Sequence, residues 1–229
     1  MTARQLGDAT WPEIAQRLST LVIPLGSTEQ HGPHLPLDTD TRIAVACATR
    51  LVEARPDLVL GPAMAIGASG EHAGFAGTLS MGAEVFEAAI VEIGRSADAF
   101  DGVIWVNAHG GNSVALRSAH ATLVSESRRS LVLRCAVPGG DSHAGRTETS
   151  MMLSIAPQVV RSDLAAPGRS EPWAELSEAI LAGGVVAVSD NGVLGDPAGA
   201  TAEEGKRFLD GIHAQFLDAV ARWIDGDSS

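Results

Sequence analysis

Three runs of strand length constrain the fold most, because each is almost entirely apolar and each ends in a polar, glycine-rich segment. They span residues 21–25, 103–107 and 131–137, and a shorter run of the same kind spans residues 58–60. Strands that are buried on both faces have such continuous apolar stretches, whereas strands with one wet face alternate. The runs therefore predict a mostly parallel sheet covered by helices on both faces, in an α/β fold.

Predicted helices alternate with these strands. Apolar spacing and capping residues predict helices over residues 10–18, 41–53, 84–100, 113–127, 148–155, 174–181 and from Thr201 towards Ile224. Thr10 and Thr201 begin segments with the spacing of a capping box, and Asn112 has the position of an N-cap. Residues 61–82 form a long glycine-rich loop, and loops of that length are usually functional or disordered.

Length and composition fit one domain over residues 1–229, with an arm at residues 1–9 and a tail at residues 225–229 that are expected to be disordered. Sixteen basic and 28 acidic residues, without a Lys/Arg cluster, argue against nucleic-acid and anionic-membrane partners. No apolar run approaches the roughly 20 residues of a membrane span, and a signal peptide is not recognisable. Cys47 and Cys135 fit small buried side chains, so a cytoplasmic location is expected.

Polar clusters follow three of the predicted strands directly. They lie at residues 29–40, at His109 and at residues 143–148. Ligands of open parallel sheets bind beyond the carboxyl ends of the strands. The sequence therefore predicts that the three clusters converge on one site.

The first cluster has five potential metal ligands within twelve residues: Glu29, His31, His34, Asp38 and Asp40. Such side chains bind zinc, iron and manganese, and the i, i+2 spacing of Glu29 and His31 projects both to one side of extended backbone. In the alternative, the acidic residues cap helices or contact water. Capping and metal ligation compete for Asp40, which precedes a predicted helix. We expect His34 and Asp38 to support the site rather than to bind metal.

His109 lies in the segment Asn-Ala-His-Gly-Gly-Asn, in which Gly110 and Gly111 allow close approach of backbone or ligand. The alternative for His109 is a structural core or capping histidine. The alternative for the glycine pair is a phosphate-binding loop, but the spacing of known phosphate motifs is missing. His143 and Glu148 form a candidate catalytic acid/base pair, although a carboxylate also suits a helix start.

The remaining histidines differ in context. His72 lies in the long loop and is a candidate substrate-binding residue, together with Gly110 and Gly111. His120 and His213 lie in predicted helices, so we expect both to be structural.

Glu29, His31, Asp40 and His109, with Glu148 as a fifth ligand, are sufficient for two adjacent divalent ions bridged by one carboxylate. Such a site lowers the pKa of bound water to about 7 and stabilises both the attacking and the carbonyl oxygen. The sequence has no G-x-S-x-G elbow. A metal-bound hydroxide is therefore the predicted nucleophile, and amide hydrolysis is the best-matched reaction.

The segments at residues 25–40, 107–112 and 143–150 resemble motifs of the creatininase family, and the resemblance extends over about residues 10–224. It implies a three-layer α/β/α sandwich, a metal-dependent amidohydrolase, two divalent ions per subunit (zinc, iron or manganese), and a homo-oligomer, either a hexamer or an octamer. By position it implies metal ligation by Glu29, His31, Asp40 and His109, with Asp40 bridging. It also implies proton transfer by His143.

One position departs from this pattern. Creatininase has a metal-binding glutamate two residues after the histidine matched by His109, whereas this chain has Gly111. The second ion then needs another ligand, for which Glu148 is the candidate. Gly110 stands where creatininase has an aromatic residue, which argues against creatinine as the substrate.

Within the family, the chain is most similar to peptidases that cleave a modified C-terminal Val-Tyr-derived unit from a ribosomally made precursor peptide. That modified peptide is the expected substrate. A hydrolase of a cyclic amide or formamide is the alternative enzyme. A non-catalytic metal-binding assembly protein is the alternative from a different class.

Overall fold

The computed structural model describes residues 5–16 and 19–226. Four parallel strands form one sheet in the order β2-β1-β3-β4. The strands are β1 (Thr20–Leu25), β2 (Leu58–Leu60), β3 (Val103–Asn107) and β4 (Ser130–Arg134). They confirm the predicted parallel sheet, although the fourth strand ends before the predicted residue 137 because the chain leaves the sheet after pairing Arg134 with Asn107.

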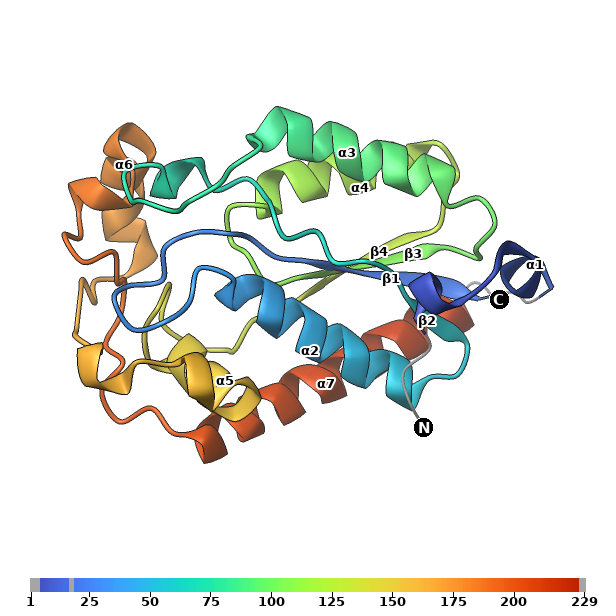
Figure 1. Ribbon diagram of the computed structural model, residues 1–229. Coiled ribbons are helices and arrows are strands. Elements are labelled where there is room, and N and C mark those ends of the chain that lie inside the picture. Colours follow the sequence, from blue (N-terminus) through green and yellow to red (C-terminus); the bar gives the residue numbers. More distant parts are fainter. Residues whose placement is uncertain (1–4, 17–18, 227–229) are drawn as a thin grey trace.

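Helices cover both faces of this sheet. They are α1 (Trp11–Ala15), α2 (Thr39–Ala54), α3 (Ala83–Ser96), α4 (Ser113–Ser125), α5 (Arg146–Ile155), α6 (Trp173–Gly183) and α7 (Ala202–Asp225). Short 3-10 helices span Leu6–Asp8, Gly70–His72, Pro157–Val159, Ser162–Leu164 and Val185–Ala187. In Figure 1, α3 and α4 lie on one face of the sheet, and α2, α5 and α7 lie on the other. This arrangement is the expected three-layer α/β/α sandwich.

Alternate strand residues contribute to two different cores. Val22 and Ile104 pack with residues of α2, α5 and α7, whereas Leu21, Ile23 and Trp105 pack with residues of α3 and α4. Every residue of β1 and β3 is buried. The continuous apolar runs of the sequence follow from this, because each strand must present apolar side chains to helices on both faces.

The start of α2 decides the role of Asp40. The helix begins at Thr39, and Asp38 has the N-cap position, with its carboxylate accepting from Arg42 Nε. Asp40 therefore lies in the first helical turn, and the alternative in which it caps the helix is wrong. Its carboxylate is buried and points instead to the ends of the strands.

Other predicted caps have mixed outcomes. The Thr10 N–H donates to Glu13, as a capping box requires, whereas the predicted extension of that helix to residue 18 lies outside the described residues. Thr201 accepts from the Glu204 N–H, but Glu204 binds Arg146 instead of completing the box.

Asn112 precedes α4 but does not cap it through its side chain. It accepts a hydrogen bond from the Ala68 N–H and donates to the Gly26 oxygen. Its side chain therefore connects the loops that follow β1 and β2 to the loop that follows β3. The sequence shows a polar residue at the start of this helix. It does not show that the side chain binds Ala68 and Gly26, because these lie in loops far away in the sequence.

The remaining boundaries differ from prediction by a few residues. Helix α3 ends at Ser96 rather than residue 100, and α5 begins at Arg146 rather than residue 148. Gln5, within the N-terminal arm, forms an isolated parallel bridge with Leu60 of β2. Among the described residues, no helix is long and apolar enough to cross a membrane.

Candidate metal centre

A cavity of about 610 Å³ opens where β1, β3 and β4 end. Its wall includes residues from all three polar clusters and from the long loop, namely Glu29, Asp40, Glu71, His72, His109, His143 and Glu148. Side chains far apart in the sequence meet here because the parallel strands end at one edge. The predicted convergence is therefore present, and the volume is typical of a small-ligand site.

One group of buried side chains consists of Glu29, Asp40 and His109, whose ligand atoms lie within 4.8 Å of one another. His109 Nε2 lies 3.2 Å from Glu29 Oε2, and His109 Nδ1 lies 3.1 Å from Asp40 Oδ2. Two carboxylates and one imidazole are a usual ligand set for a divalent ion.

A second group consists of His31, Asp40 and Glu148. His31 Nε2 lies 3.1 Å from Asp40 Oδ1 and 3.9 Å from Glu148 Oε2. Asp40 therefore belongs to both groups and directs one oxygen to each. This is the geometry that a bridging carboxylate requires.

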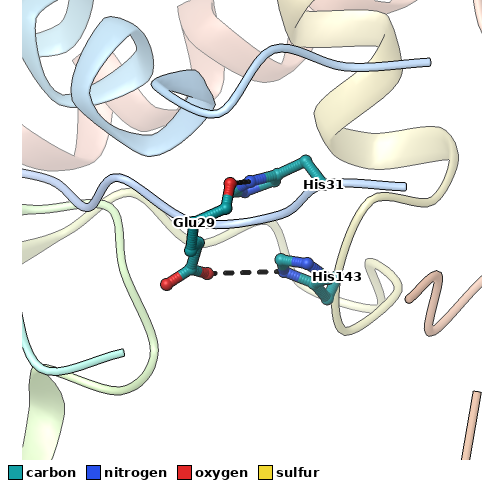
Figure 2. A group of neighbouring side chains, drawn as sticks. All are labelled: Glu29, His31 and His143. Atoms are coloured by element: carbon teal, nitrogen blue, oxygen red, sulfur yellow. Dashed lines mark hydrogen bonds and ion pairs between the residues drawn. The ribbon is translucent and has the colours of Figure 1, made fainter. Parts of the chain in front are cut away.

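His31 and Glu148 are held by backbone groups. In Figure 2, His31 Nδ1 points to the Glu29 backbone oxygen, and the two atoms are 3.1 Å apart. With the proton on Nδ1, the Nε2 lone pair faces Asp40 and Glu148, as metal ligation needs. The Ala144 N–H donates to Glu148 Oε2 at 2.6 Å. Glu148 therefore binds a backbone N–H near the start of α5 and also belongs to a possible ligand group.

Glu29 provides a test of whether these residues fit a metal ion. Its side chain is 0% exposed, and within the described residues neither carboxylate oxygen accepts a hydrogen bond of normal geometry. Burying an ionised carboxylate without such partners is costly unless a cation compensates. The ligand types and this unsatisfied carboxylate together fit a divalent ion.

Electrostatics keep two carboxylates of the site ionised. Burial alone would raise the pKa of Glu29, but attraction to His109 outweighs it and lowers the pKa to about 2. Burial likewise opposes ionisation of Asp40, yet His31 and His109 hold its pKa well below the usual range. Both carboxylates are therefore anionic at neutral pH, as metal ligands must be.

The pKa values of His31, His109 and Glu148 are raised rather than lowered. Burial would lower the pKa of His31, but Asp40 raises it to about 10, and Glu29 raises the pKa of His109 well above its ordinary value against the same effect. The pKa of Glu148 rises to about 7, chiefly through burial. An incoming metal ion must therefore displace protons from the imidazoles.

His143 lies next to the first two groups. Its Nδ1 is 3.8 Å from Glu29 Oε1, and Figure 2 shows the two side chains facing each other. Its ring centroid is 4.3 Å from that of His31. Burial lowers the pKa of His143 well below its ordinary value, so the imidazole is neutral beside the candidate ligands.

The long loop contributes two neighbouring residues. His72 Nε2 lies 3.3 Å from Glu29 Oε1, and burial lowers the pKa of His72 to about 4. Glu71 Oε1 lies 3.8 Å from His109 Nε2, and its pKa is raised, mainly by burial. Glu71 was not predicted as a site residue. Its position beside His72, in a long loop of the kind that often contributes to sites, could have indicated it.

The two glycines after His109 have different surroundings. A Cβ at Gly111 would overlap the Ala68 carbonyl oxygen and the Glu71 carboxylate, whereas a Cβ at Gly110 would meet no atom within 4 Å. Glu71 therefore occupies the space next to His109 that a side chain at position 111 would need. A glutamate at position 111 is incompatible with this loop arrangement.

This difference predicts unequal effects of the same substitution. Gly111→Ala is expected to destabilise the protein by about 1–3 kcal/mol, because the Ala68 backbone cannot move without repacking the loop. For a chain of this size, each kcal/mol lowers Tm by about 2–4 °C. Thermal unfolding measures the effect, with Gly110→Ala as the matched control. Equal Tm values for both variants would contradict this packing.

His34, Asp38 and His120, which were not predicted as ligands, have partners outside the two ligand groups. His34 Nε2 lies 2.9 Å from Thr149 Oγ1, and Asp38 pairs with Arg42. His120 Nδ1 lies 3.0 Å from Ser130 Oγ on β4, and His213 lies in α7 and is not one of the residues that line the cavity.

Comparison with known proteins gives a consistent result. The family model "Creatininase: Creatinine amidohydrolase" matches residues 7–220. A mycofactocin precursor peptide peptidase from Mycobacterium ulcerans (strain Agy99) is 47% identical over 231 residues, covering 97% of this chain and 92% of the relative. The protein with the same description from Mycolicibacterium smegmatis (strain ATCC 700084 / mc(2)155) is 47% identical over 224 residues, covering 95% and 91%.

Solved structures agree at the level of the fold. A crystal structure of creatinine amidohydrolase (creatininase) has a TM-score of 0.83 at 22% identity and covers 96% of this chain and 97% of that one. A structure described as "Creatininase Mn" has a TM-score of 0.82 at 22% identity, with 96% and 98% covered. The likeness extends over nearly the whole chain.

Proposed function

The chain belongs to the creatininase family, and from that premise we propose that it is a metal-dependent peptidase acting on the mycofactocin precursor peptide. It hydrolyses the amide bond that holds the modified C-terminal Val-Tyr-derived unit. The observation that carries this proposal is the pair of ligand groups that share Asp40 beside a buried, neutral His143. The 47% identity to precursor peptide peptidases supports the substrate.

The proposed ligands divide between two divalent ions. One ion would be held by Glu29, Asp40 and His109, and the other by His31, Asp40 and Glu148. Glu148 would take the place of the metal-binding glutamate that creatininase has at the position of Gly111. When bound, such ions polarise an amide carbonyl and lower the pKa of a coordinated water. Zinc, iron and manganese all suit these ligands, and solved creatininases include a Zn-Zn type and a manganese form.

Proton transfer falls to His143 in this proposal. Its Nδ1 faces the cavity next to Glu29, within reach of a group bound between the ligand groups. A neutral imidazole accepts a proton from the attacking water and delivers it to the leaving amine nitrogen. Glu148 is the alternative candidate for this role where it does not hold an ion, because its pKa of about 7 in the metal-free protein suits both protonation states.

The cavity walls suit the apolar part of a modified peptide. Val137, Met151, Ile180 and Leu194 line it beyond the polar cluster. Apolar walls orient such a substrate and exclude water from the reacting groups. His72, Gly110 and Gly111 line or adjoin the same space and are proposed to contact the substrate. We also propose that the protein acts in the cytoplasm as a hexamer or octamer.

The proposal is tested by metal removal and a substrate panel. Protein treated with chelator is expected to lose turnover of the modified precursor peptide, and zinc, iron or manganese is expected to restore it. Mass spectrometry of the products locates the cleaved bond. Creatinine and formamides form the other arms of the panel.

Each outcome of the panel has a distinct meaning. Release of the C-terminal unit only in the presence of metal supports the proposal. Turnover of creatinine or a formamide, but not of the peptide, would instead favour the cyclic-amide or formamide hydrolase. Bound metal without hydrolysis of any amide would favour a non-catalytic assembly protein, and full activity without metal would refute the mechanism.

A further inference from the structure

Gln30 lies between two histidines of the site, and backbone groups orient its side-chain amide. Its Oε1 accepts from the Gly32 N–H at 2.9 Å, and its Nε2 donates to the Gly192 oxygen at 2.9 Å. A backbone N–H only donates and a carbonyl only accepts, so the amide oxygen and nitrogen cannot be exchanged. The side chain is buried, and this orientation is therefore held within the fold.

The second amide hydrogen of Gln30 determines the protonation of His72. Gln30 Nε2 lies 2.8 Å from His72 Nδ1. Because Gln30 is the donor, Nδ1 must accept, and the proton of the neutral ring is on Nε2. That Nε2–H faces Glu29 Oε1 at 3.3 Å. His72 Nε2–H therefore lies near this carboxylate without forming a hydrogen bond of normal geometry with it.

The backbone of Gln30 determines the protonation of His143. His143 Nε2 lies 2.8 Å from the Gln30 backbone oxygen, which can only accept, so this nitrogen carries the proton. The Gln30 amide nitrogen is also 3.0 Å from His143 Nε2. The two hydrogens of the Gln30 amide already have acceptors, namely His72 Nδ1 and the Gly192 oxygen. If one of them were donated to His143 Nε2 instead, that acceptor would lose its donor. The Gln30 backbone oxygen would also lose the donor that His143 provides.

We propose that Gln30 is a positioning residue that sets the tautomers of both imidazoles, and that Nδ1 is the proton-accepting atom of His143. The proton on Nε2 leaves the Nδ1 lone pair pointing to the cavity, 3.8 Å from Glu29 Oε1. Groups that hold the far nitrogen of an imidazole in this way orient the ring and fix its tautomer. The kinetic consequence rests on the proposed function, whereas the tautomers themselves do not.

Nitrogen NMR of the zinc-loaded protein tests the tautomers without any substrate. Long-range ¹H–¹⁵N spectra of imidazole-labelled protein separate Nε2–H from Nδ1–H rings, and the spectrum of His143→Gln assigns the signal of His143. The native protein is expected to show His72 and His143 as Nε2–H tautomers. An Nδ1–H signal for His143 would overturn the proposal.

Two variants disturb Gln30 in different ways. Gln30→Met keeps the length of the side chain but removes its donor and acceptor, and a Cβ in Gly192→Ala would overlap the Gln30 amide, which must then move. Both are expected to mix the tautomers of His72, whereas His143 is expected to keep its Nε2–H tautomer, because the Gln30 backbone oxygen that accepts from it remains. Gln215→Met, at an exposed position in α7, is the matched control with an unchanged spectrum.

Kinetics of the same variants separate positioning from structural support. With folding verified by thermal unfolding, Gln30→Met is expected to lower kcat by about 10- to 100-fold with little change in KM. Native tautomers together with native kcat in Gln30→Met would refute the positioning role. If native protein does not cleave the precursor peptide at all, the proposed function fails, whereas the NMR spectra still decide the tautomers.

Discussion

Asp40→Asn is expected to lose most of its bound metal and at least about 1,000-fold in turnover. The two oxygens of Asp40 face different ligand groups, so one substitution weakens both. An asparagine has one neutral oxygen acceptor, and its amide nitrogen would face one of the imidazoles. Bound metal contributes several kcal/mol to the transition state, and each 1.36 kcal/mol is about tenfold in rate.

Metal content and turnover of Asp40→Asn are measured on the same preparation. Asp38→Asn is the matched control, because Asp38 lies two residues away in an exposed ion pair with Arg42. Exposed pairs contribute about 0–1 kcal/mol to stability, so this control should keep its metal and its activity. Full metal content and turnover in Asp40→Asn would exclude a bridging role for this carboxylate.

His143→Ala is expected to keep its metal and to lose about 100- to 10,000-fold in kcat, the usual contribution of a general acid/base. His143 does not belong to either group that shares Asp40, and its neutral ring faces the cavity. The comparison of metal content with kcat therefore separates proton transfer from metal binding.

His213→Ala provides the histidine control, since His213 lies in α7 and is not one of the residues that line the cavity. It is expected to retain native kcat and metal content. Loss of metal in His143→Ala would instead make His143 a ligand, within the third possible group that it forms with Glu29 and His31.

The sequence predicted the arrangement of the site because strand ends and polar clusters coincide. Glu29, His31 and His109 closely follow the ends of β1 and β3, and these parallel neighbours bring such residues together at one edge of the sheet. Glu148 was predicted for the same reason, from the segment after β4. The continuous apolar runs likewise predicted a sheet with two covered faces.

Features that depend on loop packing were not predictable in the same way. Glu71 reaches His109 because the loop after β2 folds back over Gly111, and no local pattern specifies that return. The amide of Gln30 is oriented by Gly192, which lies 162 residues further along the chain. The role of Asp40 required the start of α2, and a helix start is easily misplaced by one or two residues when several neighbouring residues can cap.

The number of divalent ions bound per chain tests the central claim most directly. Metal analysis of the metal-loaded protein, after removal of loosely bound ions, is expected to give two ions per chain, because two ligand groups share Asp40. One ion per chain, or none, would contradict the two-ion site bridged by this carboxylate.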